Sequence, residues 1–180
     1  MSRIYAIILS FATIVVALDQ WSKAFIVKLI PIEGQSLPFL SWFDWVLVYN
    51  PAAAFGMFGF IPDEYRKWFF YFMTPIILII FWFSFVKKLD KKETLMPIAL
   101  GLVLGGALGN YIDRFTYGKV VDFVDWFYTT SSESCIPLFS YHGNNTCHWP
   151  AFNVADISIN VAFGLIVISQ IILAKNDKKE

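Results

Sequence analysis

The sequence predicts an all-α membrane protein with four transmembrane helices and a small extracytoplasmic cap that contains β-strands. Apolar residues make up 57% of the 180-residue chain and charged residues only 16%, whereas about a quarter of a soluble domain is charged. A spanning helix needs about 20 apolar residues, and three uncharged runs approach that length: residues 68–86, 94–112 and 157–174. The net charge of zero predicts no attraction to nucleic acid.

A fourth helix is predicted at the N-terminus, where the pattern is less regular. Residues 4–18 are apolar, polar residues follow from Asp19 to Lys23, and apolar character resumes at Phe25. A cleaved signal peptide is the alternative interpretation, because Arg3 precedes the apolar run and a Val15-x-Ala17 pair near its end resembles a cleavage site. The apolar residues beyond Lys23 favour a retained helix.

The distribution of basic residues predicts how these helices are oriented. Within a single membrane domain covering residues 1–180, the four helices are expected at residues 4–27, 67–87, 94–113 and 152–174. Eight of the fourteen basic residues fall on one side of this path: Arg3, Lys87, Lys88, Lys91, Lys92, Lys175, Lys178 and Lys179. The positive-inside rule makes that side, with both termini, cytoplasmic. Segments 28–66 and 114–151 are then extracytoplasmic.

The two outer segments differ in composition. Residues 39–50 are rich in aromatic and β-branched residues, which predicts one or two short strands lying on the membrane surface. Residues 125–149 are more polar and contain two cysteines, so we expect a loop there.

Two aspartates stand out, because ionisable groups in membrane segments are costly and therefore functional candidates. Asp122 lies between apolar residues just beyond the third helix, and Asp156 lies early in the fourth, on one helical face with Asn153 and Asn160. Each aspartate also has a structural interpretation. Asp122 suits an interfacial turn, and Asp156 suits a helix start, where the helix dipole favours it and Asn153 serves as N-cap.

Other polar residues lie near the same predicted helix ends. Asp19 and Lys23 are four residues apart, so they share a helix face and can form an ion pair. Asn110 and Arg114 share a face at the end of the third helix, where an arginine can hold a carboxylate or a substrate carbonyl. Glycines every four residues before Asn110 form a smooth stripe that permits close helix packing.

Five motifs in this chain resemble those of the lipoprotein signal peptidases, the type II signal peptidases of bacteria. The motifs are DQWSK at 19–23, NPAAAFG at 50–56, GGALGNYIDR at 105–114, VVDF at 120–123 and FNVAD at 152–156. They occur in the family's order, on a four-helix hydropathy profile of the family's length, and they cover nearly the whole chain. Each motif alone is weak, but the ordered set is highly specific.

The resemblance implies an aspartic endopeptidase that removes signal peptides from prolipoproteins, cleaving just before a cysteine that carries diacylglyceryl. The implied catalytic pair is Asp122 and Asp156. The residues implied to support the site or hold substrate are Asp19, Lys23, Asn50, Asn110, Asp113, Arg114 and Asn153. The enzyme is expected to be a monomer in the bacterial cytoplasmic (inner) membrane, in contact with lipids, with its site near the outer leaflet and without a cofactor.

The chain departs from the family pattern in two places. Ala52 stands where the family usually has glycine, in the loop that contacts substrate, and its methyl group restricts the backbone there. The stretch between Asp122 and Asp156 is also long, and it includes Cys135 and Cys147. A disulfide is plausible on the oxidising side of the membrane, with free thiols as the alternative. Zinc binding by these cysteines with the two nearby histidines, His142 and His148, is disfavoured because the spacing matches no established pattern.

The chemistry of peptide hydrolysis explains why two carboxylates are needed. Two adjacent carboxyl groups cannot both ionise cheaply, so one acts as base toward water while the other, protonated, polarises the scissile carbonyl. A transporter or proton channel is a rival interpretation, but it would place acids near the bilayer midplane rather than at outer helix ends. A structural or assembly factor is a second rival, which would need no convergent carboxylates.

Overall fold

The computed structural model describes residues 2–52, 57–86, 89, 94–131 and 134–176. The chain divides into two compact units. We call residues 1–19, 71–112 and 154–180 the helical unit, and residues 20–70 and 113–153 the cap unit. Part of the predicted substrate loop, 53–56, and six of the eight basic residues used for orientation lie outside the described residues: Lys87, Lys88, Lys91, Lys92, Lys178 and Lys179.

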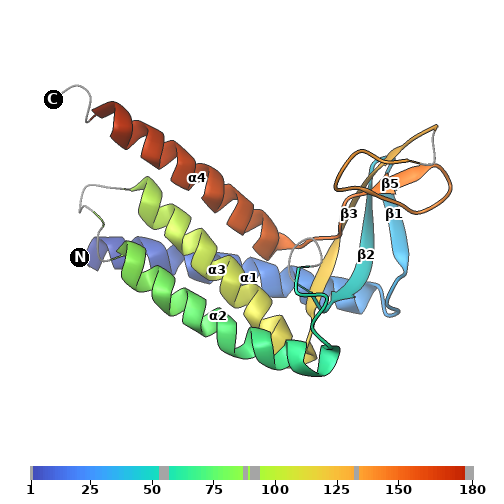
Figure 1. The fold of residues 1–180 in the computed structure, drawn as a ribbon, viewed down its shortest axis with the longest axis horizontal. Helices are drawn as coiled ribbons and strands as arrows, with labels where there is room; N and C mark the ends of the chain where they lie inside the picture. Colours follow the sequence, from blue (N-terminus) through green and yellow to red (C-terminus); the bar gives the residue numbers. More distant parts are fainter. Residues whose placement is uncertain (1, 53–56, 87–88, 90–93, 132–133, 177–180) are drawn as a thin grey trace. The chain divides into compact units, whose positions relative to one another are not determined.

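Four helices in the described part of the chain are long and apolar enough to cross a membrane. They are α1 (Ser2–Leu29), α2 (Asp63–Phe85), α3 (Leu95–Tyr117) and α4 (Val154–Asn176) (Figure 1). Together with a small antiparallel sheet, they confirm the predicted fold class. The third helix ends at Tyr117, four residues beyond its predicted end, so Asp113 and Arg114 lie within it.

Glycines allow the helices of the helical unit to approach closely, as the predicted stripe requires. A Cβ atom on Gly101 would lie 2.7 Å from the carbonyl oxygen of Ile8 in α1, and one on Gly106 would lie 2.6 Å from the carbonyl oxygen of Ala155 in α4. Such distances leave no room for a side chain. Opposite sides of α3 therefore pack directly on the backbones of α1 and α4.

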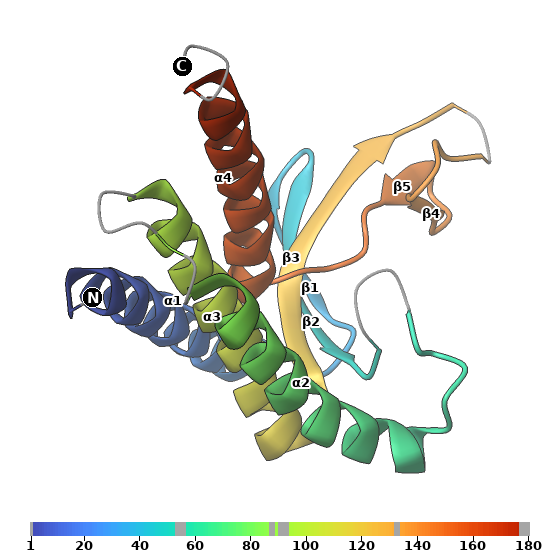
Figure 2. The same cartoon turned by 60° about the vertical axis from the view of Figure 1, so that its left-hand side comes forward.

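The cap unit contains a five-stranded antiparallel sheet of order β1-β2-β3-β5-β4 (Figure 2). Its strands are β1 (Ser36–Leu40), β2 (Phe43–Asn50), β3 (Val120–Thr129), β4 (Ser140–Tyr141) and β5 (Thr146–His148). The predicted strands within 39–50 are present as parts of β1 and β2. The predicted loop over 125–149 is wrong, because β3 continues to Thr129 and two further strands follow. Asp122 and Asp125 interrupt the apolar pattern of β3, so that pattern does not predict a strand there.

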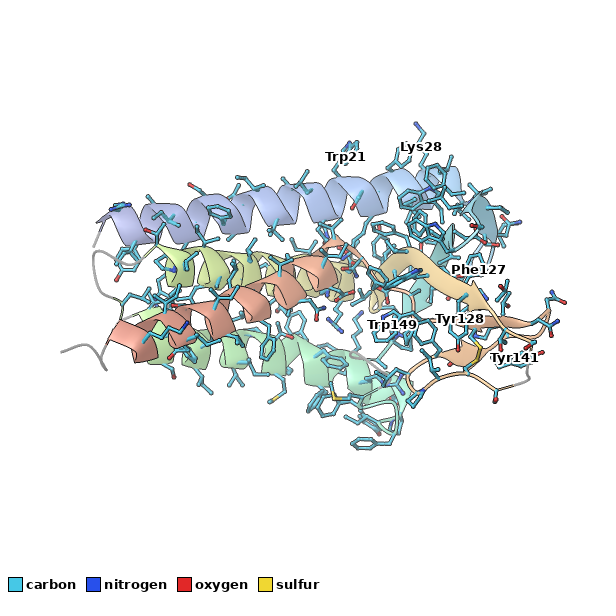
Figure 3. All side chains as sticks on the ribbon, turned by 90° about the horizontal axis from the view of Figure 1, so that it is seen from above. Trp21, Lys28, Phe127, Tyr128, Tyr141 and Trp149 are labelled. Carbon is cyan, nitrogen blue, oxygen red and sulfur yellow. A yellow bond between two sulfur atoms is a disulfide. The ribbon has the colours of Figure 1, made fainter. Side chains whose placement is uncertain are left out.

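Large apolar side chains cover the outside of the helices. Trp21 points away from α1 in Figure 3 and is 69% exposed, and Ile80 in α2 is 60% exposed. Contiguous apolar surface of this kind is rare on soluble monomers. Its place on helices of spanning length agrees with a multi-pass membrane protein.

Candidate active site

Asp122 lies on β3 in the cap unit, and its carboxylate is held by two asparagine amides. Asn50, at the end of β2, donates from Nδ2 to Oδ2 at 2.9 Å, and Asn153 donates from Nδ2 to Oδ1 at 2.7 Å. Asp122 is only 2% exposed and Asn153 is fully buried. Burial of a charged group is tolerated only where hydrogen bonds replace water. These two amides provide such bonds, one to each oxygen.

The strand that carries Asp122 is anchored by a buried ion pair. Lys23 of α1 lies 2.8 Å from Oδ2 of Asp113 in α3, and both side chains are almost fully buried. The same carboxylate accepts from Gln20 Nε2 and from the backbone N–H of Val121, each at 2.9 Å. Helix spacing suggested Asp19 as a partner for Lys23, but it could not suggest Asp113, which is 90 residues away. Asp113 thus fixes the backbone next to Asp122.

Arg114 and Asn50 organise the start of the loop after β2. Asn50 Oδ1 accepts from the backbone N–H of Ala52 at 2.9 Å, and the Arg114 guanidinium donates to the Ala52 carbonyl at 3.2 Å. The guanidinium also lies over the ring of Phe70, 4.3 Å from its centroid. The backbone of Ala52, where the sequence departs from the family, is therefore held by Asn50 and Arg114.

Tyr49 precedes Asn50 in β2 and has a perturbed hydroxyl pKa. Burial raises the pKa of the Tyr49 hydroxyl, and the neighbouring Tyr117, Glu33 and Asp113 raise it further. The phenol therefore remains protonated at neutral pH.

Asp156 lies in the helical unit, in the first turn of α4. Its Oδ1 accepts from Asn110 Nδ2 of α3 at 2.9 Å, and its side chain is partly exposed. A carboxylate in the first turn is also stabilised by the helix dipole. Asp156 thus shares with Asp122 a bond from an asparagine amide, although it belongs to another element and another unit.

Asp19 supports the start of α4 in the same unit. Its buried carboxylate accepts from the backbone N–H of Ala155 at 2.9 Å. Gly109 of α3 makes room for it, since a Cβ atom there would lie 2.5 Å from Asp19 Oδ2. The N-terminal amides of a helix have no partner within the helix, and Asp19 satisfies one of them, next to Asp156.

Comparison with known proteins identifies the family. The family model for signal peptidase (SPase) II matches residues 11–172. The chain belongs to the signal peptidase II family. A lipoprotein signal peptidase of Syntrophotalea carbinolica is 38% identical over 92% of this chain and 91% of its own length, and one of Cupriavidus necator is 37% identical over 91% and 82%.

Solved structures agree with this signal peptidase II assignment. A bacterial membrane enzyme determined by the in meso method at 2.3 Å matches with a TM-score of 0.72 and 29% identity, over 96% of this chain and 92% of that one. A second, at 1.9 Å, matches with a TM-score of 0.68 and 30% identity, over 91% of each chain. The protein is therefore a membrane peptidase of this family.

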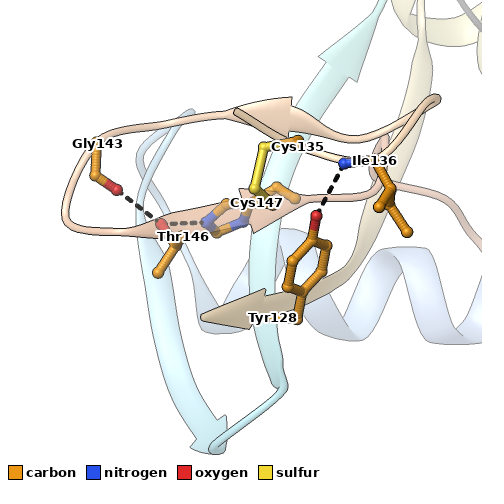
Figure 4. Close-up of a disulfide and its surroundings, with 7 residues drawn as sticks. Tyr128, Cys135, Ile136, Gly143, Thr146 and Cys147 are labelled. Atoms are coloured by element: carbon orange, nitrogen blue, oxygen red, sulfur yellow. Dashed lines mark hydrogen bonds between the residues drawn. A yellow bond between two sulfur atoms is a disulfide. The ribbon is translucent and has the colours of Figure 1, made fainter. Parts of the chain in front are cut away.

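In this signal peptidase II, the long segment between the two aspartates includes a hairpin formed by β4 and β5, and a disulfide links β5 to the residues before β4. Cys135 and Cys147 are bonded, with their Cα atoms 5.7 Å apart, and Cys147 is fully buried (Figure 4). The hydroxyl of Tyr128 accepts from the backbone N–H of Ile136 at 3.0 Å beside the disulfide. The free-thiol alternative is therefore wrong, and neither sulfur is available as a thiolate ligand for a metal.

His148, at the end of this hairpin, pairs with Asp125 of β3, a contact that sequence analysis missed. His148 Nδ1 lies 2.9 Å from both carboxylate oxygens of Asp125, and Nε2 lies 3.0 Å from the Thr146 hydroxyl. The His148 ring stacks on Phe127 at 5.0 Å and on His142 at 4.6 Å. The pair lines a cavity of about 520 Å³ in the cap unit, with Ser36 and Val46 among the other lining residues. No local sequence pattern indicates this pair, because it depends on the pairing of β3 with β5.

Proposed function

We propose that this peptidase is an aspartic endopeptidase that removes signal peptides from diacylglyceryl-modified prolipoproteins, cleaving just before the lipidated cysteine. Asp122 and Asp156 are its catalytic pair. The observation that supports this most is the environment of Asp122, a buried carboxylate with an amide donor on each oxygen. The names of the relatives, lipoprotein signal peptidases, support the substrate.

The proposed reaction uses one carboxylate as base and the other as acid. The ionised carboxylate takes a proton from water as the water attacks the scissile carbonyl, and the protonated one polarises that carbonyl. A carboxyl group of the pair then passes a proton to the leaving amine. The donors bound to each aspartate, Asn50, Asn153 and Asn110, are neutral amides that can accompany either protonation state of a carboxyl group.

The chain itself ties the second aspartate to the first. Asn153 binds Asp122 through its amide and precedes Asp156 by three residues. Three residues span at most about 11 Å between Cα atoms. This short connection is compatible with the proposed pair.

The remaining residues of the site are proposed to hold substrate or to position the pair. Arg114 and Asn50 hold the backbone of Ala52, which we propose lies against the extended peptide. Asp19, Lys23 and Asp113 position the elements that carry the aspartates.

We further propose that the enzyme is a monomer in the bacterial cytoplasmic membrane, with both termini cytoplasmic and its site near the outer leaflet. The positive-inside distribution supports this orientation. In that position the acyl chains of the substrate remain among membrane lipids while its peptide reaches the aspartates.

Cleavage of a diacylated prolipoprotein by the purified protein tests this function. Wild type should release the signal peptide with the new N-terminus at the lipidated cysteine, as mass spectrometry would show. Asp122→Asn and Asp156→Asn should each lower kcat by at least about 100-fold, the lower range for a positioned acid or base. Glu64→Gln, an exposed carboxylate in α2, is the control and should keep wild-type activity. Full activity in either Asn variant would refute the catalytic pair.

A further inference from the structure

We propose that His148, paired with Asp125, is a positioning residue for this reaction. The pair fixes the register in which residues 146–153, which we call the return segment, run along β3. That register places the amide of Asn153 on the carboxylate of Asp122. The inference rests on the proposed function, but its structural half can be tested separately.

The return segment follows β3 from the far end back to Asp122. In β5, His148 is opposite Phe127, and beyond β5 the backbone N–H of Trp149 donates to Trp126 at 2.8 Å. Phe152 then forms a bridge to Val124, with N–H···O distances of 3.1 and 2.9 Å. The hydrogen bonding is thus nearly continuous up to Asn153.

The register changes by one residue along this path. From Trp149 to Phe152 the return segment advances three residues, while β3 advances only two, from Trp126 to Val124. Such an extra residue is a bulge, which locally disrupts the ladder. The backbone ladder alone therefore specifies the register here less strongly than an uninterrupted pair would.

The His148–Asp125 pair is compatible with one register only. His148 is directly opposite Phe127, and Asp125 lies two residues along β3 on the same face as Phe127. A slip of one residue would move His148 to the other face of the sheet. It would lose both its stacking on Phe127 and its contact with Asp125.

The hydrogen bonds of His148 make this contact charge-assisted. The Thr146 hydroxyl donates to the Gly143 carbonyl at 2.9 Å (Figure 4), and the same hydroxyl lies 3.0 Å from His148 Nε2. His148 Nδ1 contacts both oxygens of the Asp125 carboxylate, and a hydrogen bond to a carboxylate is charge-assisted. The two side chains are 17% and 14% exposed. Such a pair is stronger than a neutral hydrogen bond and less screened than one at the surface.

The consequence for catalysis follows from the position of Asn153. Its amide donates to Asp122 Oδ1 at 2.7 Å and to the Val121 carbonyl at 3.2 Å. Loss of the register upstream would shift this amide relative to Asp122. A misplacement of about 1 Å at a reacting group can cost on the order of 100-fold in rate, so His148 acts through Asn153 without touching substrate.

Three variants separate this role from a general effect on folding. His148→Phe keeps an aromatic ring to stack on Phe127 but removes the charge-assisted bonds. Asp125→Asn keeps a hydrogen-bond acceptor for Nδ1–H but removes the charge. Glu64→Gln is the matched loss of one carboxylate outside the return segment. Each full-length protein is purified and assayed for kcat and KM on diacylated prolipoprotein, and amide exchange is followed in residues 120–129 and 149–153.

We expect kcat to fall about tenfold in His148→Phe and about threefold in Asp125→Asn, with KM within twofold of wild type, on the scale set by misplacement. The amides of Phe123, Val124 and Phe152 should exchange faster than in wild type, and the increase should be larger in His148→Phe than in Asp125→Asn. Glu64→Gln should match wild type in both measurements.

Two outcomes would overturn the inference. The first is wild-type kcat in folded His148→Phe enzyme, or a change in KM alone. The second is unchanged exchange at Val124 and Phe152 in both variants. Failure of wild type to cleave the substrate would instead refute the proposed function, and this catalytic role with it, while the exchange data would still decide the register claim.

Discussion

Asp122 and Asp156 are held in different ways in the two units of the molecule. Asp122 lies on a strand and is bound by amides from the end of β2 and from the return segment. Asp156 lies in the first turn of a long helix and accepts from the neighbouring helix α3. The strand position depends on contacts between residues 31 and 72 positions apart, whereas the helix position depends on the packing of continuous helices.

This difference predicts where the surroundings of each aspartate are vulnerable. In the cap unit, ion pairs and the disulfide fix the strands around Asp122, so polar and covalent changes should have the largest effects. In the helical unit, contacts of small residues fix α4, so added volume should have the larger effect.

The largest effect is expected from loss of the buried ion pair in the cap unit. Lys23→Met leaves the buried Asp113 carboxylate uncompensated and should cost about 3–5 kcal/mol of stability. Thermal unfolding of the purified protein and amide exchange in residues 120–124 measure it. Gln20→Ala, which removes a neutral donor to the same carboxylate, is the control. Equal losses in the two variants would show that the charge of Lys23 contributes little.

A smaller loss is expected when the disulfide is removed. Cys135→Ser should lower the stability of the cap unit by about 2–4 kcal/mol, because the crosslink restricts the unfolded chain. A reducing agent should produce the same shift in wild type and none in the variant. Ser140→Ala, an exposed change in the same hairpin, should be neutral. Accelerated exchange in α4 residues 160–172 as large as that in the hairpin would contradict the confinement of this effect to the cap unit.

The helical unit should respond to volume by a still smaller amount. Gly106→Ala places a methyl group 2.6 Å from the Ala155 carbonyl and should cost about 1–3 kcal/mol through overpacking. Gly164→Ala in α4 is the matched control, since its added carbon meets no atom within 4 Å. That control should gain up to about 1 kcal/mol from helix propensity. Equal effects at the two positions would remove the packing argument.

The same difference explains what the sequence could predict. The helices follow from local apolar runs, which a bilayer requires at a known length, and the described part of the chain has four helices of that kind. The β3 strand is not predicted from the sequence, because Asp122 and Asp125 break its apolar pattern and favour a turn and a loop there. The partner of Lys23 and the pairing of His148 with Asp125 depend on contacts that no local period encodes.

Non-additivity between the two aspartates is the most direct test of the central claim, that Asp122 and Asp156 act as one catalytic unit. Single-turnover cleavage of a diacylated prolipoprotein is measured for Asp122→Asn, Asp156→Asn and the double variant. When two residues act together, the first substitution already removes most of the rate that both provide. The rate of the double variant should therefore lie within about threefold of that of the slower single variant. Losses that multiply in the double variant, or a single variant as fast as wild type, would contradict the account.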